Sequence, residues 1–408
     1  MSKTPITQKI SYLLIMGISA KLLIDTTIQL FNPFLTIIAA GMGISAVTLG
    51  GIVAIRGVMG LTAPIIGTVA DKIGYRKIMQ ISLALSGTGM ILAGISQNII
   101  LFSLAIILTG IGHAGYTPNL HAYLSSKLSY EKRARGIGII EYSWALAGII
   151  GLFTAGFLID TFSWRAPFIF FGILLLLISI IYFTLPTSHL DKKQTKLSTI
   201  SRKKDIPLLK RIQSFFDLGS NAKSAWGTII IQGLNIFAIM QVMIIHGGWL
   251  NSEYGLSPAY LGTIALIFGC TDLIASIYVS IAVDKIGKKK SVVIGVAGMT
   301  AGFVLMPFLN ISLYLAVLGL VIPRIFFEFA TVSNLALLTE QVPEQRGKVM
   351  SLSTTFGLIG ITLSSAIGPI SYYSKGVIGL ATVSFTAGLI SLIIVVLVVK
   401  DRIYSTAG

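Results

Sequence analysis

The sequence predicts an all-α membrane protein with twelve transmembrane helices in two six-helix halves that repeat each other. Of its 408 residues, 54% are hydrophobic and 11% are charged, a balance typical of polytopic membrane proteins and not of soluble domains. Twelve apolar runs are each long enough to cross hydrocarbon. A motif that follows the second run recurs after the eighth, which indicates an internal repeat.

The twelve runs form two sets of six, each run having the about 20 residues that a crossing needs. The first run is interrupted by Lys21 and Asp25 and is followed by no small-residue cleavage site, so we expect a span and not a cleaved signal. The predicted domains are an N-terminal six-helix bundle (1–186), a cytoplasmic linker (187–224) and a C-terminal six-helix bundle (225–408). The spans are placed at 10–40, 46–70, 78–97, 99–126, 135–159, 165–186, 225–250, 258–282, 291–310, 312–338, 347–371 and 376–400.

Lysines and arginines concentrate in alternate loops. They follow spans 2, 4, 8 and 10 and fill the linker, whereas the opposite loops carry only Arg165 and Lys375. Positively charged loops stay in the cytoplasm, so we predict a protein of the cell (inner or plasma) membrane with both termini cytoplasmic. The net charge of +16 follows this alternation and indicates no basic groove, so no nucleic-acid partner is expected. The amphipathic stretch 206–216 of the linker is predicted to lie on the membrane face.

The internal repeat is visible in the loops. The segment Gly67–Lys77 recurs as Ser280–Lys290, which sets Asp71 and Asp284 213 positions apart. A second pair, YEKRARG after span 4 and PEQRG after span 10, holds the same place relative to the spans. Equal spacing and equal position indicate two halves of parallel topology.

These motifs resemble the loop signature G-x-x-x-D-[RK]-x-G-x-[RK]-[RK] of the major facilitator superfamily of secondary transporters, and in particular its bacterial-type drug or sugar efflux-like permeases. The resemblance covers nearly the whole chain, since span count, midpoint linker and both motif copies agree, although Ser280 replaces the first glycine of the second copy. It implies the major facilitator fold and alternating access between the two halves. The resemblance indicates almost nothing about the identity of the substrate.

The resemblance also implies a cytoplasmic gate in which Asp71, Arg76 and Arg135 form a latch that breaks as the transporter switches. Glycine lets helices approach closely and permits a tight turn, and the aspartate can accept hydrogen bonds from the arginine and from a helix N-terminus. The alternative is that the loop cations only set the topology. The gate residues are Gly67, Asp71, Lys72, Gly74, Arg76, Lys77, Arg135, Asp284 and Arg346.

Two departures from the drug–proton antiporters of this family weaken an assignment to export. The arginine they usually carry midway along span 4 is missing, since Ile106 and Leu108 precede Gly110 and Gly112. The glycine-rich run of span 5 lacks its proline, although its small residues still allow close helix contact.

Charged residues inside the spans are the strongest indication of function. A charge at mid-bilayer costs about 2.5–3.5 kcal/mol, so it usually faces a bundle interior or a wet cavity and marks a solute or proton path. The signs do not cancel, which leaves one carboxylate without a cation. The carboxylates are Asp25, Glu141, Asp272 and Glu328, and the cations are Lys21, Arg56 and Arg324.

Span 1 carries a polar stripe of Lys21, Asp25, Gln29 and Asn32, spaced four, four and three residues apart on one helix face. We expect the stripe to line a substrate cavity. The alternative is a structural Lys21–Asp25 ion pair buried between helices. Arg56 of span 2 is expected to reach Asp25, as a gating or structural pair or as a substrate-binding arginine.

Spans 8 and 10 place Asp272, Arg324 and Glu328 near mid-depth. Two acids around one arginine cannot both be compensated, so one of them should load a proton near neutral pH. We expect Glu328 to be the proton-coupling residue, with Asp272 second and Asp25 as a further candidate. The alternative is a permanently ionised network that braces the C-terminal half.

Further cavity candidates lie in spans 4 and 5. Glu141 either snorkels toward the loop cations or, beside Trp144, recognises a cationic substrate. His113 is interpreted as a hydrogen-bonding cavity residue with Tyr116 near it, the alternative being a proton relay. His113 and His121 are too far apart to chelate together, so no metal site is predicted.

The sequence therefore predicts a proton-coupled secondary transporter, and efflux of a small organic solute is favoured over uptake. A facilitator or symporter for a polar nutrient or organic anion is the alternative within transport. A membrane sensor or embedded enzyme is the alternative outside it, and no G-x-S-x-G, H-E-x-x-H or P-loop motif supports it. We expect a monomer without cofactor, whose partners are a small-molecule substrate, protons and the lipid bilayer.

Overall fold

The computed structural model describes residues 5–128, 136, 138–186, 216–342 and 345–401. These residues form two compact units. The first contains the chain up to 186 together with Leu256–Gly269, and the second contains 216–255 and the chain from Cys270 onward. The first half of span 8 therefore groups with the N-terminal spans. The predicted domain boundaries at 187 and 225 stay a prediction.

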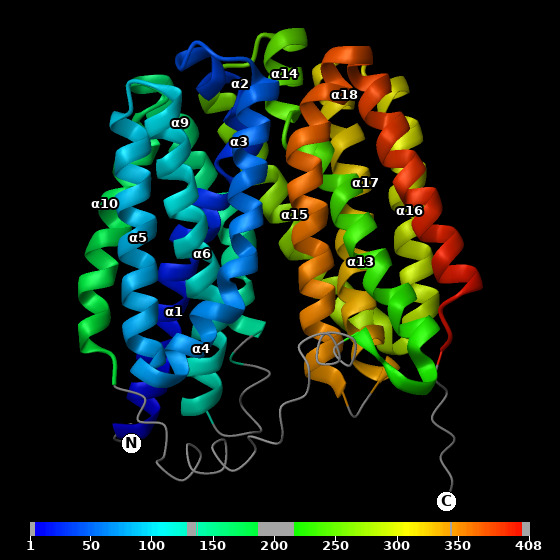
Figure 1. The fold of residues 1–408 in the computed structure, drawn as a ribbon. Helices are drawn as coiled ribbons and strands as arrows, with labels where there is room; N and C mark the ends of the chain where they lie inside the picture. The colour runs from blue at the N-terminus through cyan, green and yellow to red at the C-terminus, as the bar shows by residue number, and fades with distance from the viewer. Residues whose placement is uncertain (1–4, 129–135, 137, 187–215, 343–344, 402–408) are drawn as a thin grey trace, which may run out of the picture. The chain divides into compact units, whose positions relative to one another are not determined.

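The first unit is built from helices that correspond to the six N-terminal spans (Figure 1). Helices α5 and α6 pack together, and α10 packs on α5. A π-helical turn, η2, interrupts span 5. The elements are α1 (Pro5–Gln29), α2 (Phe31–Gly41), α3 (Ala46–Val58), η1 (Met59–Thr62), α4 (Ala63–Ile73), α5 (Tyr75–Ile95), α6 (Ile99–Lys127), α8 (Ser143–Leu146), η2 (Ala147–Leu152), α9 (Phe153–Thr161), α10 (Ala166–Ile181) and η3 (Tyr182–Thr184).

The second unit repeats this pattern with longer uninterrupted helices. Helix α13 packs along α18, and α16 packs along α17. Span 7 breaks between α13 and α14, at Ile244–Ile245. The elements are η4 (Gly219–Asn221), α13 (Ala222–Met243), α14 (His246–Tyr254), α15 (Pro258–Ile286), α16 (Lys288–Leu309), α17 (Leu313–Gln341) and α18 (Arg346–Leu397).

The described residues hold eleven helical segments long and apolar enough to cross a membrane. The last of them, Lys348–Leu397, is 50 residues long and bends where Lys375 and Gly376 leave helical geometry. It therefore supplies two spans, and the twelve-helix membrane fold predicted from the sequence is confirmed.

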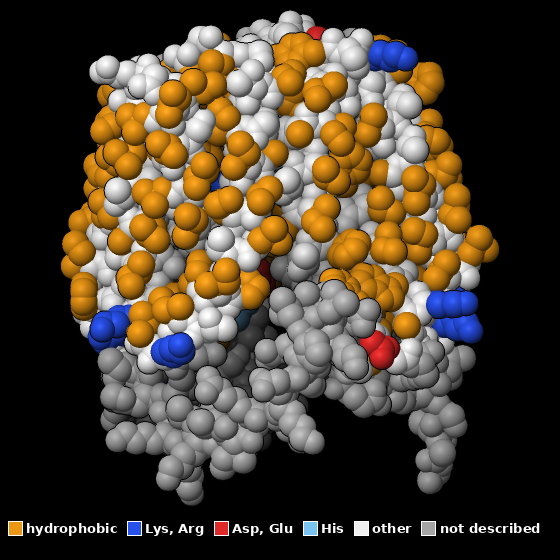
Figure 2. All heavy atoms as spheres, in the orientation of Figure 1, with side chains coloured by type: hydrophobic (Ala, Val, Ile, Leu, Met, Phe, Trp, Pro, Cys, Tyr) orange, Lys and Arg blue, Asp and Glu red, His pale blue; other side chains and the backbone are white. Residues whose placement is uncertain are grey.

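The surface of the helices is apolar and part of the interior is charged, the reverse of a water-soluble protein. Figure 2 shows hydrophobic side chains spread over the visible face, with the few coloured Lys and Arg side chains near its edges. Tyr314 and Leu397 are 87% and 77% exposed, whereas Lys21 and Asp25 are 3% exposed. This distribution fits helices whose outer sides face lipid.

The repeated loop motif adopts the same geometry in both units. Gly74 has φ 96° and ψ 138°, and Gly287, 213 positions later, has φ 94° and ψ 142°. Residues with a side chain rarely adopt this region. Two residues further on, Arg76 donates to the carbonyls of Phe183 (3.3 Å) and Leu185 (2.7 Å) at the end of span 6.

Lys289, the counterpart of Arg76, donates to the Val396 carbonyl (3.3 Å) near the end of span 12. In each unit a cation in the first turn of the third span, α5 or α16, thus binds carbonyls at the C-terminal end of the last span, where the helix dipole favours positive charge. The repeat seen in the sequence is therefore also a repeat of contacts.

Replacing Gly287 by alanine should destabilise the protein by about 1–3 kcal/mol, because alanine would be strained in the backbone conformation that Gly287 adopts. A Cβ added there meets nothing within 4 Å, so no steric clash contributes. Denaturant unfolding in detergent measures the loss. Gly51→Ala is the control, since Gly51 lies within α3 and also has open space. Equal stability of the two variants would show that the turn does not require glycine.

The glycines of span 5 allow the close contacts expected from the sequence. A Cβ at Gly151 would lie 2.0 Å from the Thr26 hydroxyl of α1. Gly148 and Gly156 face the first half of α15. A Cβ added at Gly148 would lie 3.2 Å from the Cα of Gly269, and a Cβ added at Gly156 would lie 3.0 Å from the Cα of Gly262. These contacts explain why Leu256–Gly269 groups with the first unit.

Candidate functional site

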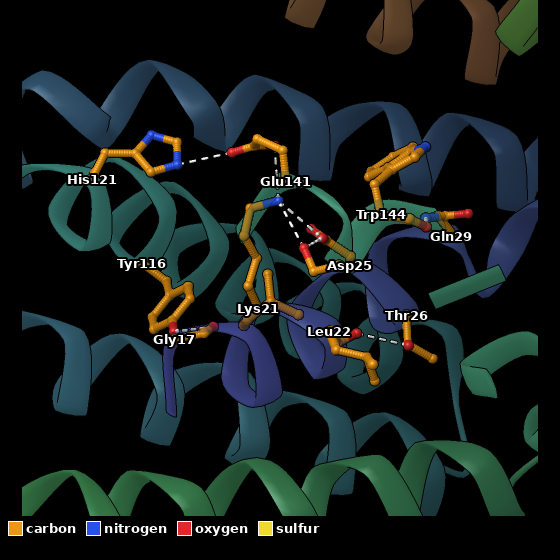
Figure 3. Close-up of polar contacts among 12 residues, drawn as sticks. Gly17, Lys21, Leu22, Asp25, Thr26, Gln29, Tyr116, His121, Glu141 and Trp144 are labelled. Carbon is orange, nitrogen blue, oxygen red and sulfur yellow. Dashed lines mark hydrogen bonds and ion pairs between the residues drawn. The ribbon is translucent and has the colours of Figure 1, made fainter. Parts of the chain in front are cut away.

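A buried ionic cluster lies in the first unit between α1 and the start of span 5. Lys21 and Asp25 stand one turn apart on α1, with 2.9 Å between Lys21 Nζ and Asp25 Oδ2. Lys21 Nζ also lies 3.2 Å from Glu141 Oε2. Ser143 Oγ donates to Asp25 Oδ2 at 2.5 Å. One ammonium group thus serves two carboxylates, as Figure 3 shows.

The cluster is closed at one end and open at the other. The side chains of Lys21 and Asp25 are each 4% exposed, whereas those of Glu141 and His121 are 49% and 33% exposed. His121 Nε2 lies 2.9 Å from Glu141 Oε1 (Figure 3). The partners of Glu141 in the structure are therefore Lys21 and His121. The loop cations Arg133 and Arg135, toward which snorkelling was expected, lie outside the described residues.

Sequence reasoning did not place His121 at the site. It favoured His113, two turns earlier on α6, whose Nε2 lies 3.0 Å from Thr27 Oγ1 of α1. The contact between His121 and Glu141 depends on how α6 approaches span 5, which the sequence does not show. The sequence did indicate that His121 lies on the same face of its helix as His113.

The prediction that Arg56 reaches Asp25 is wrong. Its guanidinium donates to the carbonyls of Thr27 (3.2 Å) and Ile28 (3.0 Å) and lies 4.9 Å from the centroid of the Phe31 ring. The reason is the break in span 1 at Leu30. Pro33 has no N–H for the carbonyl four residues earlier, and Arg56 binds the last turn of α1 beside this break.

The other candidates of span 1 and span 5 lie at the same junction. Gln29 is buried and donates to the Trp144 carbonyl at 3.0 Å, as Figure 3 shows. Asn32 and Trp144 are partly exposed. Gln29 therefore fastens span 1 to span 5, while Trp144 and Asn32 retain accessible surface.

Tyr116 does not line a cavity in this structure. Its side chain is fully buried, and its hydroxyl lies 2.5 Å from the Tyr182 hydroxyl. The Tyr182 hydroxyl in turn donates to the Met16 carbonyl at 3.2 Å. The expectation for Tyr116 is corrected: it is a packing residue that joins α1, α6 and the end of span 6.

The second unit holds a bidentate ion pair. Arg324 of α17 donates through Nε to Asp272 Oδ1 (2.7 Å) and through Nη2 to Asp272 Oδ2 (2.5 Å) of α15. Its Nη1 donates to Met243 Sδ at 3.0 Å, next to the break in span 7. Asp272 and Arg324 are 3% and 9% exposed. Such fork-like pairing satisfies both oxygens of the carboxylate.

Glu328 lies one turn after Arg324 but stands outside this pair. Its Oε2 accepts from Ser276 Oγ at 3.2 Å. Within the part of the chain that the structure describes, no lysine, arginine or histidine lies at ion-pair distance from it. Its exposure is intermediate. Glu328 is thus a partly exposed residue whose neighbouring cation, Arg324, already forms an ion pair with Asp272.

The charge count differs between the units. In the first unit, Lys21 and Arg56 match Asp25 and Glu141 in number. In the second, Arg324 is the cation that the described spans place near Asp272 and Glu328. The surplus carboxylate inferred from the sequence therefore belongs to the second unit, and the geometry distinguishes Glu328 from Asp272. Among the described residues, no three His, Cys, Asp or Glu side chains gather as metal ligands would.

The gate motif is only partly visible. Arg135 lies outside the described residues, and so do the side chains of Asp71, Asp284 and Arg346. The latch therefore stays a prediction. A Cβ added at Gly67 meets no described atom within 4 Å, and the close helix approach expected there stays a prediction. Lys72 and Lys77 are exposed.

The twelve-span fold with ionic clusters inside its helices defines an integral membrane protein of the transporter class. The family model for the Major Facilitator Superfamily matches residues 18–249 and again residues 226–405. The chain belongs to this superfamily.

Two relatives in Bacillus subtilis align with most of the chain. It is 25% identical over 373 residues to the uncharacterized MFS-type transporter YceJ of Bacillus subtilis (strain 168), covering 90% of this chain and 91% of that one. It is 22% identical over 345 residues to Multidrug resistance protein 2 of the same organism, covering 81% of each. A D-xylose-proton symporter structure aligns with a TM-score of 0.77 at 17% identity, over 96% of this chain and 98% of that chain. At such low identity the structural likeness shows the fold alone.

Proposed function

We propose that the protein is a proton-coupled secondary transporter that exports a small organic solute by alternating access across the cell membrane. The single observation that carries the coupling is Glu328, an acid inside a span that is hydrogen-bonded to a serine and, among the described residues, has no cation at ion-pair distance. Secondary transport itself follows from the superfamily. The direction of export is supported by the likeness to a relative named for multidrug resistance.

The chemistry assigned to Glu328 follows from charge balance. With Glu328 protonated, Asp272 and Arg324 neutralise each other and the cluster carries no net charge. With Glu328 ionised, the cluster carries one negative charge at a depth where isolated charge is costly. The ionised cluster is therefore favoured when the site is hydrated, and the neutral one when it is closed. A conformational change that alters hydration is thereby linked to proton binding.

The first unit supplies the groups that we assign to solute recognition. Glu141, His121 and Trp144 keep accessible surface, whereas Lys21 and Asp25 are buried behind them. Glu141 keeps 49% of its side chain exposed although it is paired with Lys21 and His121, and the aromatic ring of Trp144 follows three residues later. A carboxylate and an aromatic ring that both keep accessible surface suit an amphiphilic, cationic solute.

An organic anion fits the site less well. Two donors of Arg324 are engaged by Asp272, and Arg56 is engaged by backbone carbonyls. Binding an anion at either would require displacing these partners. We assign no covalent reaction to the protein.

Collapse of the pH gradient should stop net solute movement against its concentration gradient in vesicles containing the purified protein. A thermal-shift screen at two pH values first identifies a solute that stabilises the protein. Transport of that solute is then measured with an imposed pH gradient and after an ionophore removes it, with protein-free vesicles as the control. Transport that is indifferent to the pH gradient would support a facilitator instead.

A further inference from the structure

A strip of polar side chains runs through the interior of the second unit, along α13 and α17. On α13 it consists of Ser224, Thr228, Gln232 and Asn235, which are between 0% and 8% exposed and recur every three or four residues on one helix face. Polar groups so deep in a membrane helix bundle are costly unless they are hydrogen-bonded. Such a continuous strip therefore requires an explanation beyond helix packing.

The strip begins where α13 starts and α17 ends. The side chain of Gln341, the last residue of α17, accepts through Oε1 from Asn221 Nδ2 (3.0 Å) and Ser224 Oγ (2.5 Å). Two turns further in along α17, Asn334 Nδ2 donates to the Thr228 carbonyl (3.0 Å) and to Gln232 Oε1 (3.1 Å). The two helices are thus joined by polar contacts over two successive levels.

Several atoms of this strip have no partner. The buried atoms Asn334 Oδ1, Ser333 Oγ, Asn235 Nδ2 and Thr331 Oγ1 make no hydrogen bond within the described structure. Asn334, Ser333 and Asn235 are 0% exposed. Asn334 Nδ2 already donates to two acceptors. Flipping the side-chain amide would place its oxygen against those acceptors, so a flip cannot supply the hydrogen bond that Oδ1 lacks. Buried polar groups of this kind are normally satisfied by ordered water.

Helix α16 adds a further unpartnered hydroxyl at the same level. A Cβ at Gly295 would lie 2.4 Å from the Ala330 backbone nitrogen, so α16 and α17 touch there. Helices α16 and α17 are antiparallel. Ser291 lies one turn before Gly295 on α16, and Asn334 lies one turn after Ala330 on α17, so these two residues are at the same level. Ser291 is 0% exposed, and its Oγ is unpartnered.

The mixture of atoms identifies the ligand chemistry. A bound cation would need oxygen ligands only, whereas this set contains an amide N–H donor, an amide oxygen and hydroxyls that both donate and accept. Water, which makes about three hydrogen bonds when buried, matches the set. On α17 the strip also leads to the candidate proton carrier, because Glu328, Thr331 and Asn334 follow one another at intervals of three residues. The groups facing Glu328 are Ser276, Asp272 and Arg324.

We propose that this strip binds a chain of ordered water molecules and is the route by which a proton passes between Glu328 and the end of the second unit where α13 begins. The inference rests on the proposed role of Glu328. By the loop charges, that end is the cytoplasmic one. The waters link Glu328 to Gln341 past Thr331 and Asn334, and so allow proton exchange on that side.

The test measures how fast Glu328 takes up a proton. Purified protein is placed in vesicles in one orientation, the pH is lowered suddenly on the linker side, and the infrared band of the protonated carboxyl that Glu328→Gln removes is followed in time. Asn334→Leu and Ser333→Ala should slow its appearance by about tenfold, as expected for the loss of about one hydrogen bond in the path. Ser364→Ala is the matched control, because Ser364 is also a buried serine but bonds to the Ile361 carbonyl of its own helix.

The outcomes separate the two claims. A band that titrates but appears equally fast in Ser333→Ala and the parent protein overturns the water route, and Ser333→Ala decides this even where Asn334→Leu fails to fold. The absence of any titrating band that depends on Glu328 overturns the proposed function and the route with it. A structure at a resolution that reveals water should show density bonded to Asn334 Oδ1 and Ser333 Oγ, and dry packing there would also overturn the route.

Discussion

Glu328→Gln abolishes proton-driven accumulation of the solute, while the protein stays folded in the membrane. Glutamine keeps the size of the side chain and its hydrogen bond with Ser276, but it cannot release a proton. The Asp272–Arg324 pair remains intact and neutral in the variant. Accumulation in vesicles with an imposed pH gradient should fall to the level of vesicles without protein, and binding of the solute should persist.

Glu253→Gln is the matched control for this variant. Glu253 is also a glutamate of the second unit, but it is exposed and accepts from Asn310 Nδ2 at 2.6 Å. Its variant should keep the pH dependence of the parent protein. If Glu328→Gln retained that dependence as well, Glu328 would be removed from the proton path, and Asp272 would be the next residue to test.

Lys21→Met destabilises the protein by about 3–5 kcal/mol, the cost of leaving a buried charge without its partner. Lys21 carries the ammonium group shared by Asp25 and Glu141. Without it, the partner that the described structure leaves to Asp25 is the Ser143 hydroxyl. Denaturant unfolding in detergent measures the loss. Acidification should recover part of it, because a protonated Asp25 needs no cation.

Two variants check this explanation. Lys72→Met removes a lysine that is exposed, so it should change stability by less than about 1 kcal/mol. Combining Lys21→Met with Asp25→Asn should recover much of the stability, since the uncompensated carboxylate is then gone. If Lys21→Met alone were as stable as the parent protein, the cluster would contribute no net electrostatic stabilisation.

The fold could be predicted from the sequence because its determinants are local. Hydrophobic length identifies a span without reference to its neighbours, and the glycine turns of the loop motif repeat at a fixed interval. The break in span 1 at Leu30 lies just before Pro33, which has no N–H for a helical hydrogen bond. The break in span 7 at Ile244–Ile245 has no proline at or just after it, and we have no local physical reason for its position.

The pairing of charges could be predicted only in part, because it depends on which helices touch and in which rotation. Equal depth along spans 8 and 10 was enough to bring Asp272, Arg324 and Glu328 into one region. It could not decide which acid takes the bidentate position. Every residue has a backbone carbonyl, so a sequence cannot indicate which carbonyls an arginine binds. Arg56 was therefore matched with the nearest predicted carboxylate, Asp25. His121 was missed for a similar reason, since its partner Glu141 lies on another span.

An infrared titration of the protein in lipid, comparing the parent chain with Glu328→Gln, measures directly whether Glu328 exchanges a proton. We expect a protonated carboxyl band that disappears as the pH rises through the neutral range and that is missing from the variant. If the two proteins gave the same carboxyl spectra from mildly acidic to alkaline pH, Glu328 would not exchange a proton, and the coupling assigned to the surplus acid would be contradicted.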